Sequence, residues 1–458
     1  MEKVYDRLSA FVDGIMPEFF EDLRVQISIP SVEGAPEEGA PFGTEVARSL
    51  EHLLSIAEKM GFKTVNYEGY VGVIEWGEGE EMLGILSHVD VVPAGDLSAW
   101  DTDPFEMTEK DGFLVGRGIA DDKGPLLSCL YGMYALKQMG LKPGKRVRFI
   151  VGTNEETGWG CIRYYKEHRL EQPDASFSPD GMFTVVNREK GIYTGDFSRK
   201  VASDVEISAG EASNLVPAHA SAVLGADCDK EALMSAVKEY GGELAVTDGG
   251  EVTVACKGCN APSHTPENGV SAITALLKIL EKAGNPEIRN AASDLLAAAD
   301  GTDGASLGID CEDKPSGRLT LNLGLLTLKD GVMNAAFDIR TPVTKDIRSI
   351  ADVAETKLAA AGFTCTARRI KEPLYVPEDT PLIKDLCKVY ETATGTEAVL
   401  YSIGGGTYAR AFPNCVCFGA VYPDEKLTVH SPNERTLIKN IIQNIKMYGL
   451  AIYQLAIK

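Results

Sequence analysis

The stretch Gly84-Ile-Leu-Ser-His-Val-Asp-Val-Val-Pro93 ends an apolar run with a histidine and an aspartate two residues apart. Because successive side chains of a strand alternate between its two faces, His88 and Asp90 point the same way. The carboxylate of Asp90 can then hold one imidazole nitrogen and leave the other nitrogen free for a metal ion. The ordinary alternative for an isolated His-x-Asp is a hydrogen-bonded pair at the end of a strand.

A second acidic cluster lies in the string Gly116-Arg-Gly-Ile-Ala-Asp-Asp-Lys-Gly-Pro125. It places two adjacent aspartates in a glycine-bounded turn, directly ahead of an apolar helical pattern. A carboxylate has two oxygens and can bridge two cations, and Asp121 is the candidate for that role. The alternative is that Asp121 or Asp122 caps the helix that follows.

A third acidic cluster ends the apolar strand pattern Arg146-Val-Arg-Phe-Ile-Val-Gly-Thr-Asn-Glu-Glu-Thr-Gly158. Adjacent carboxylates repel each other unless a positive charge lies between them. A cation would resolve the conflict, with one glutamate as its ligand and the other placed near a water molecule as a base. Solvated acidic residues in a loop are the alternative for Glu155 and Glu156.

Two more polar residues complete a set that is suited to metal ions. Asp180 follows a short strand pattern in Ala175-Ser-Phe-Ser-Pro-Asp-Gly181, and His430 lies in Leu427-Thr-Val-His-Ser-Pro-Asn433. The chain therefore offers two imidazoles and three carboxylates, with two further carboxylates beside them. In sequence order the set is His88, Asp121, Glu156, Asp180 and His430, with Asp90 and Glu155 next to its members.

This order and its local strings resemble the di-zinc metallopeptidases that include carboxypeptidase G, succinyl-diaminopimelate desuccinylase and aminoacylase-1. The strings are HVDVVP, GRG-x-x-DDKGP, GT-x-EE, a Pro-Asp turn, a GGGTYAR loop and a late histidine, and they span nearly the whole chain. Among these enzymes the strings are most similar to those of the PepV-type dipeptidases.

The resemblance implies a role for each residue of the set. His88 and Asp180 would bind one metal ion, Glu156 and His430 the other, and Asp121 would bridge the two. Glu155 would be the general base that serves a metal-bridging hydroxide, and Asp90 would orient His88. A cis peptide bond between Asp121 and Asp122 is also implied. Imidazole and carboxylate ligands suit zinc, and they suit manganese or cobalt as well.

Alternating helix and strand patterns before Asp180 predict an α/β fold with a mainly parallel sheet flanked by helices. The strands are expected at 71–76, 82–88 and 147–152, and the helices at 4–16, 45–60 and 126–139. Shorter strands at 191–197, 320–328 and 331–340 follow, with helices at 271–283 and 346–361. Because His430 lies beyond this block, we expect residues 1–186 and 376–458 to form the catalytic domain. Residues 187–375 would be an inserted α+β domain that is well placed to act as a lid.

The inserted block carries its own candidates. The resemblance implies that His264 contacts the carbonyl oxygen in the transition state, and that Asn214 and Arg340 contact the substrate carboxylate, for which a guanidinium is suited. Without the resemblance, His264 would be interpreted as an exposed loop residue and Arg340 as a surface charge. The glycines around Gly405 lack a phosphate-binding pattern and would let the backbone approach a peptide.

Composition narrows the class of protein. A formal net charge of −22 disfavours a nucleic-acid partner, which needs clustered Lys and Arg. The N-terminus lacks the apolar segment of a signal peptide, and no stretch is long enough to span a membrane. Ten scattered cysteines fit a reducing cytoplasm, and the pair Cys256 and Cys259 has no second pair at zinc-site spacing.

The sequence therefore predicts a cytoplasmic metal-dependent dipeptidase, monomeric or homodimeric, that hydrolyses short peptides with free ends. An amidohydrolase of the deacylase or desuccinylase type would use the same metal centre with a different pocket. A third hypothesis is a non-catalytic binding protein on the same scaffold, which the intact ligand set and Glu155 disfavour.

Overall fold

The apolar run that ends at His88 forms strand β3 (Met82–His88), and every residue of this strand is buried in the computed structural model of the chain. Burial on both faces is typical of a central parallel strand that is covered by helices. Strand β3 pairs in parallel with β6 (Arg146–Gly152) on one side and with β7 (Ala175–Ser178) on the other. The structure describes residues 1–226 and 228–458.

These three strands are the centre of a mixed nine-stranded sheet with the order β1-β2-β6-β3-β7-β21-β8-β19, to which β20 is added by pairing with β8. The β7–β21 pair is also parallel, whereas the pairs toward both edges are antiparallel. The outer strands are β1 (Lys63–Tyr67), β2 (Val71–Trp76), β8 (Val185–Glu189), β19 (Leu374–Tyr375), β20 (Leu400–Ile403) and β21 (Cys415–Cys417).

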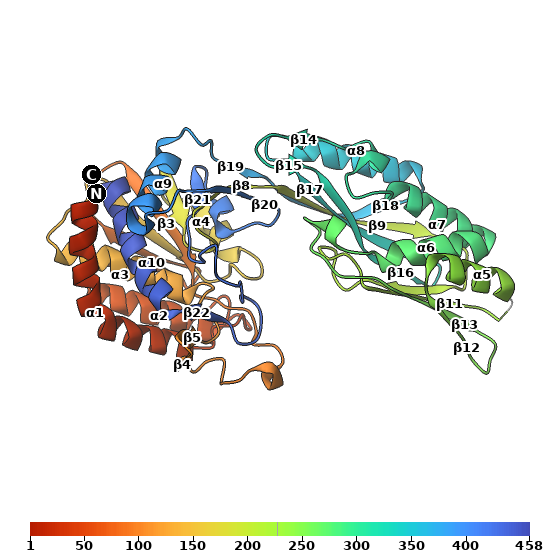
Figure 1. The fold of residues 1–458 in the computed structure, drawn as a ribbon, viewed down its shortest axis with the longest axis horizontal. Coiled ribbons are helices and arrows are strands. Elements are labelled where there is room, and N and C mark those ends of the chain that lie inside the picture. The colour runs from red at the N-terminus through yellow and green to blue at the C-terminus, as the bar shows by residue number, and fades with distance from the viewer. Residues whose placement is uncertain (227) are drawn as a thin grey trace. The chain divides into compact units, whose positions relative to one another are not determined.

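Three helices from distant parts of the sequence pack together beside this sheet (Figure 1): α1 (Glu2–Ser28), α3 (Lys123–Gln138) and α10 (Ile438–Ile452). Two glycines let α3 and α10 approach closely, because a Cβ atom on Gly132 would lie 2.7 Å from the backbone nitrogen of Gly449. The remaining elements of this part of the chain are α2 (Thr44–Lys59), α4 (Gly160–Glu167), α9 (Pro381–Thr394) and a small sheet of β4 (Thr108–Lys110), β5 (Phe113–Val115) and β22 (Arg435–Leu437).

Helix α1 is longer than predicted. The sequence pattern indicates a helix that ends at Met16, before Pro17. The helix continues through Pro17 to Ser28. A proline inside a helix removes one backbone hydrogen bond and usually ends the helix. The buried stripe continues beyond Pro17, however, and its packing offsets that loss. Its members are Leu8, Val12, Met16, Phe19, Leu23 and Ile27.

The middle of the chain forms an eight-stranded antiparallel sheet with the order β12-β13-β11-β10-β16-β17-β9-β18. Burial alternates along β9, β11 and β13, as expected where helices cover one face of a sheet. Helix α6 packs on β11, β13 and β16, and α8 packs on β9 and β18. The strands are β9 (Gly191–Lys200), β10 (Glu206–Ala209), β11 (His219–Leu224), β12 (Glu243–Val246), β13 (Val252–Lys257), β16 (Thr320–Lys329), β17 (Val332–Thr341) and β18 (Thr364–Lys371).

Four helices complete this part of the chain: α5 (Lys230–Tyr240), α6 (Ala272–Ala283), α7 (Pro286–Ala298) and α8 (Ile347–Ala360), together with the short pair β14 (Glu312–Asp313) and β15 (Gly317–Arg318). The caps of two helices follow from their sequences. Ser271 accepts a hydrogen bond from the backbone of Thr274, and Asp346 accepts one from the backbone of Arg348. Both side chains satisfy N–H groups that a helix start leaves without a partner.

The chain divides into two compact units. The first comprises Met1–Asn187, Val376–Tyr401 and Gly406–Lys458, and the second comprises Arg188–Tyr375 and Ser402–Gly405. The predicted fold class, an α/β unit with helices around its sheet and a separate α+β unit, is confirmed. The sheet of the first unit, which we expected to be mainly parallel, is mixed, because only its central pairs are parallel and the pairs toward both edges are antiparallel. Among the described residues, no helix combines the length and the apolar character that crossing a membrane requires.

Candidate metal centre

The five predicted metal ligands belong to the first unit, and three of them lie at or shortly after the ends of neighbouring strands. His88 is the last residue of β3, and Asp180 comes shortly after β7. Glu156 follows β6, which is the other parallel neighbour of β3. Since parallel strands end at the same edge of a sheet, these three residues meet there, as ligand sites in open α/β sheets do.

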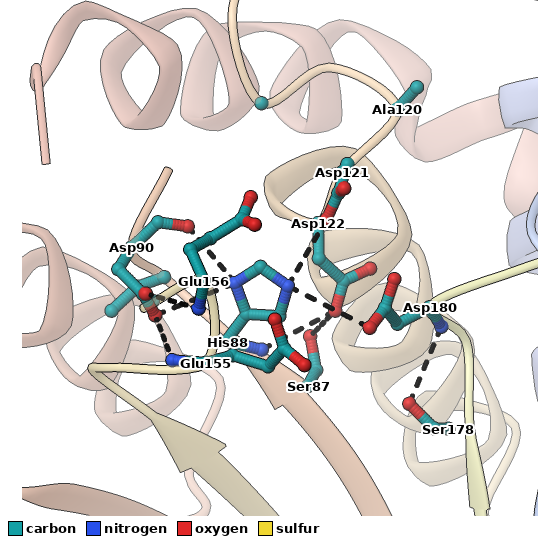
Figure 2. Close-up of polar contacts among 12 residues, drawn as sticks. Ser87, His88, Asp90, Ala120, Asp121, Asp122, Glu155, Glu156, Ser178 and Asp180 are labelled. Carbon is teal, nitrogen blue, oxygen red and sulfur yellow. Dashed lines mark hydrogen bonds and ion pairs between the residues drawn. The ribbon is translucent and has the colours of Figure 1, made fainter. Parts of the chain in front are cut away.

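His88, Asp121 and Asp180 form one group whose ligand atoms lie close enough to share a metal ion. Nε2 of His88 lies 3.2 Å from Oδ1 of Asp121 and 3.9 Å from Oδ2 of Asp180. Figure 2 shows the imidazole of His88 with one ring nitrogen toward Asp90 and the other toward Asp121 and Asp180.

Asp121, Glu156 and His430 form a second such group. Nε2 of His430 lies 3.0 Å from Oδ2 of Asp121 and 3.1 Å from Oε2 of Glu156. Asp121 is thus common to both groups and offers a different oxygen to each imidazole. His430 has a left-handed backbone with φ of 58°, and its side chain is 52% exposed, whereas that of His88 is fully buried.

Asp90 contacts His88 and the two glutamates. Nδ1 of His88 lies 3.0 Å from the backbone oxygen of Asp90 and 3.5 Å from its Oδ1 atom. The Asp90 carboxylate accepts hydrogen bonds from the backbone N–H groups of Glu155 and Glu156 at 3.1 and 3.0 Å. The carbonyl is therefore closer to the imidazole than the carboxylate that the sequence suggests. A proton on Nδ1 that faces this carbonyl leaves the Nε2 lone pair available for a cation.

Asp122 does not cap helix α3 with its side chain. Its carboxylate is fully buried and accepts hydrogen bonds from the hydroxyl of Ser87 and from the backbone N–H of His88. The helix-cap alternative is therefore wrong for this residue. The peptide bond between Asp121 and Asp122 is cis, as the resemblance implies.

Glu155 lies at the same edge as the two ligand groups, and its Oε1 atom accepts a hydrogen bond of 3.1 Å from the indole N–H of Trp159. Burial raises the pKa of the Glu155 carboxyl well above its ordinary value, and the negative charges of Asp180 and Asp121 raise it further. A raised pKa favours proton uptake and is typical of a carboxylate that works as a general base.

The electrostatics reflect acidic groups that are held close together. Burial, followed by the charge of Asp121, raises the pKa of Asp180 to about 7. Hydrogen bonds to Asp121 and Glu156 raise the pKa of His430 to about 10. Burial alone would lower the pKa of His88, but Asp121 and Asp90 beside it raise that pKa well above its usual value.

The donor set fits divalent metal ions. Nε2 of His88 and Oε1 of Glu156 are buried and make no hydrogen bond in the part of the chain that the structure describes. Buried polar atoms of this kind need an explanation, and an ion is one of the accepted ones. Carboxylate oxygens and imidazole nitrogens that face each other in two groups are ligands that zinc, manganese and cobalt accept.

The predicted substrate residues lie in the second unit. His264 is half-buried and packs against Gly404, where a Cβ atom would collide with the imidazole. Burial, with Arg340 and Lys190 nearby, lowers the pKa of His264 below its ordinary value, which favours the neutral ring. Asn214 has an exposed side chain, and its carbonyl accepts a hydrogen bond from the backbone N–H of Ser263.

Arg340 is buried, not a surface charge at the end of a strand. Its Nε and Nη2 atoms donate to the carboxylate of Asp338 at 2.6 and 3.1 Å, and its Nη1 atom donates to the carbonyl of Gly404 at 2.7 Å. The surface-charge alternative is therefore wrong. Gly405 follows directly on the residue that Arg340 contacts.

Two contacts at the centre are not apparent from sequence motifs alone. Tyr408 is fully buried, and its ring meets those of His88 and Trp159 edge to face at 6.2 and 5.6 Å. Tyr408 of the Gly-rich loop thus packs against the proposed ligand His88. Trp159 directly follows the Glu-Glu-Thr-Gly string, and this position could have marked it as a residue near the site. The sequence alone does not indicate which side chain its indole contacts.

The chain is similar to known proteins over nearly its whole length. The profile of peptidase family M20/M25/M40 matches residues 84–454. The chain is 36% identical over 455 residues to the putative dipeptidase YtjP of Bacillus subtilis, covering 95% of this chain and 96% of that protein. It is 34% identical over 454 residues to the Beta-Ala-Xaa dipeptidase of Lactobacillus delbrueckii subsp. lactis, covering 95% of each.

Solved structures share the fold at lower identity. The dipeptidase Dug1p of Saccharomyces cerevisiae is 16% identical with a TM-score of 0.61, covering 99% of both chains. Human carnosine dipeptidase 1 is 15% identical with a TM-score of 0.60, covering 98% of both chains. Since the family profile covers most of the chain and full-length relatives exceed 30% identity, the chain belongs to peptidase family M20/M25/M40.

Proposed function

We propose that this chain is a metal-dependent dipeptidase that hydrolyses short peptides with free amino and carboxyl ends. The observation that carries the proposal is the position of Asp121, whose two oxygens face two separate ligand groups while Glu155 lies beside them. Relatives that match over the full length and carry dipeptidase names support the choice of substrate class.

His88 and Asp180 would hold one divalent ion, Glu156 and His430 a second, and Asp121 would contact both. Zinc is the first candidate, with manganese and cobalt as alternatives. When bound, such a pair of ions polarises a scissile carbonyl and lowers the pKa of water. Asp90 would keep the His88 ring in the tautomer that leaves Nε2 free, and the contact of Nδ1 with the Asp90 carbonyl supports this role. The backbone N–H groups of Glu155 and Glu156 hold the Asp90 carboxylate in place.

Glu155 would accept a proton from the attacking water and deliver it to the nitrogen of the leaving amine. Amide hydrolysis needs both transfers, because an amine without that proton is a poor leaving group. The indole N–H of Trp159 donates to one carboxylate oxygen of Glu155. The other oxygen would then accept the proton from water and deliver it to the amine. We therefore assign catalysis to Glu155 and the positioning of its carboxylate to Trp159.

The second unit would act as a lid that supplies substrate contacts. In this proposal His264 donates to the carbonyl oxygen as negative charge develops, while Asn214, Arg340 and Gly405 contact the C-terminal part of the peptide. The ion pair of Arg340 with Asp338 supports a fixed position for the guanidinium. Cytoplasmic location and a monomeric or homodimeric state belong to the same proposal.

The substrate class can be tested directly with the metal-loaded protein. Dipeptides with free ends should be cleaved to free amino acids, whereas N-acylated amino acids and C-amidated dipeptides should be much poorer substrates. The measurement is release of free amino acids, compared by kcat/KM across the three sets. Faster turnover of N-acyl amino acids would assign the chain to the deacylase type. If no set is hydrolysed, the hypothesis of a non-catalytic binding protein is favoured.

The adjacent glutamates should give different phenotypes. Glu156→Ala removes a proposed ligand oxygen and should lower metal content. Glu155→Ala should retain both ions and lose about 10²–10⁴ in kcat, the usual scale for losing a general base. Metal analysis after gel filtration and steady-state kinetics separate the two variants, and each serves as the control for the other. Near-wild-type turnover of fully loaded Glu155→Ala would contradict the assignment of the base.

His264→Ala should leave metal content unchanged and reduce kcat by roughly 10²–10³, the scale for removing one donor to a developing oxyanion. His219 is exposed on β11 of the same unit and provides a matched control, since His219→Ala should keep kcat. Metal analysis and kcat measurements on both variants decide the question. If His264→Ala and His219→Ala behave alike, His264 is an ordinary loop residue.

A further inference from the structure

Glu434 is buried where the segment that carries His430 meets the turn that carries Asp121. Directly after it, β22 pairs with β5, and Arg435 lies opposite Val115. The backbone N–H of Gly116 donates to the carbonyl of Glu434 at 3.0 Å and extends that pairing. The chain leaving His430 and the chain leading to Asp121 are therefore held side by side.

The carboxylate of Glu434 binds the backbone of the Asp121 turn. Its Oε1 atom accepts hydrogen bonds from the N–H groups of Gly118, Ala120 and Asp121 at 3.1, 2.9 and 3.2 Å. Its Oε2 atom lies 2.5 Å from Nη1 of Arg117, and the side chains of this ion pair are 1% and 2% exposed. One of the three bound N–H groups belongs to Asp121 itself, so Glu434 contacts the backbone of the proposed bridging ligand.

Arg117 connects the same carboxylate to a third ligand-bearing segment. Its Nη2 atom donates to the carbonyl of Pro93 at 3.3 Å, and its guanidinium lies over the ring of Trp100 at 5.3 Å. Pro93 closes the string that begins at Gly84 and carries His88. The Arg117–Glu434 pair therefore touches the segments of His88, Asp121 and His430, which are the residues that contact one another at the centre.

We propose that Glu434, oriented by Arg117, is a positioning residue that holds Asp121 between the two ligand groups. Asp121 has to present Oδ1 to His88 and Oδ2 to His430 at the same time, at 3.2 and 3.0 Å. A small displacement of its backbone would lengthen one of these contacts. Hydrogen-bonding partners behind metal ligands commonly change metal affinity by 10–100-fold. The inference rests on the proposed function, because it requires that these residues bind metal ions.

The surroundings of the Glu434 carboxylate require a side chain that only accepts hydrogen bonds. Donors face both oxygens of Glu434: three backbone N–H groups on one side and the Arg117 guanidinium on the other. An amide carries an acceptor at one end and a donor at the other. In Glu434→Gln the NH₂ group would therefore meet a donor in either orientation, although the volume of the side chain hardly changes.

The test compares zinc affinity in Glu434→Gln and the wild-type chain by competition with a chromophoric chelator. We expect about 10–100-fold weaker binding of at least one ion. Arg117→Lys keeps the charge but loses the fork of donors that reaches both Glu434 and Pro93, so it should also weaken zinc binding, though less than Glu434→Gln does. Should Glu434→Gln not fold, wild-type zinc affinity in Arg117→Lys would overturn the inference.

Glu75→Gln is the matched control, because Glu75 pairs with the buried Arg148 at 2.6 Å between β2 and β6 of the same unit. This variant should lower the melting temperature of the metal-free protein but keep zinc affinity. The inference is wrong if Glu434→Gln binds zinc as tightly as the wild type, or if Glu75→Gln weakens binding equally. A wild-type chain that binds no zinc, manganese or cobalt would instead refute the proposed function.

Discussion

The mutual repulsion of carboxylates at one edge of the central sheet is the constraint on which the rest of this site depends. Asp121 shares one group with Asp180 and another with Glu156, and an imidazole lies in each group. Burial raises the pKa of Asp180, and the negative charge of Asp121 raises it further. Groups that repel each other stay together only where the surrounding structure holds each of them or a cation lies between them.

Several contacts of the structure hold these groups in place. Asp90 accepts the backbone N–H groups of both glutamates, Ser87 and the His88 backbone bind Asp122, and Glu434 binds the turn of Asp121. Each contact is made to a residue next to a proposed ligand or to the backbone of the ligand itself. These contacts hold the proposed ligands in one arrangement, which would reduce the reorganisation that binding an ion requires.

The sequence predicts those parts of the structure that local patterns determine. The apolar run that becomes β3 ends at His88 in both prediction and structure, and the predicted strand 71–76 has the bounds of β2. The structure brings together the five residues that the family resemblance implies as ligands, and their role as ligands stays a prediction. Helix α1 is longer than predicted, because the packing of its buried residues beyond Pro17 offsets the tendency of a proline to end a helix.

Contacts between distant residues could not be predicted in this way. Glu434 and Arg117 are far apart in the sequence. Neither the Gly-Arg-Gly string around Arg117 nor the position of Glu434 after the His430 turn indicates that the two side chains form an ion pair. Arg340 likewise looked like a surface charge, and only the fold shows its ion pair with Asp338. The antiparallel edges of the sheet depend on which strands meet, a non-local property that alternating patterns leave open.

The central claim is that Asp121 bridges two metal ions, and anomalous diffraction from crystals grown with zinc tests it most directly. The account predicts two anomalous peaks about 3.5–4 Å apart, the usual separation in dinuclear sites. One peak should lie against His88 and Asp180, the other against Glu156 and His430, with an oxygen of Asp121 bound to each. A single peak, or two peaks that Asp121 does not join, would contradict the account.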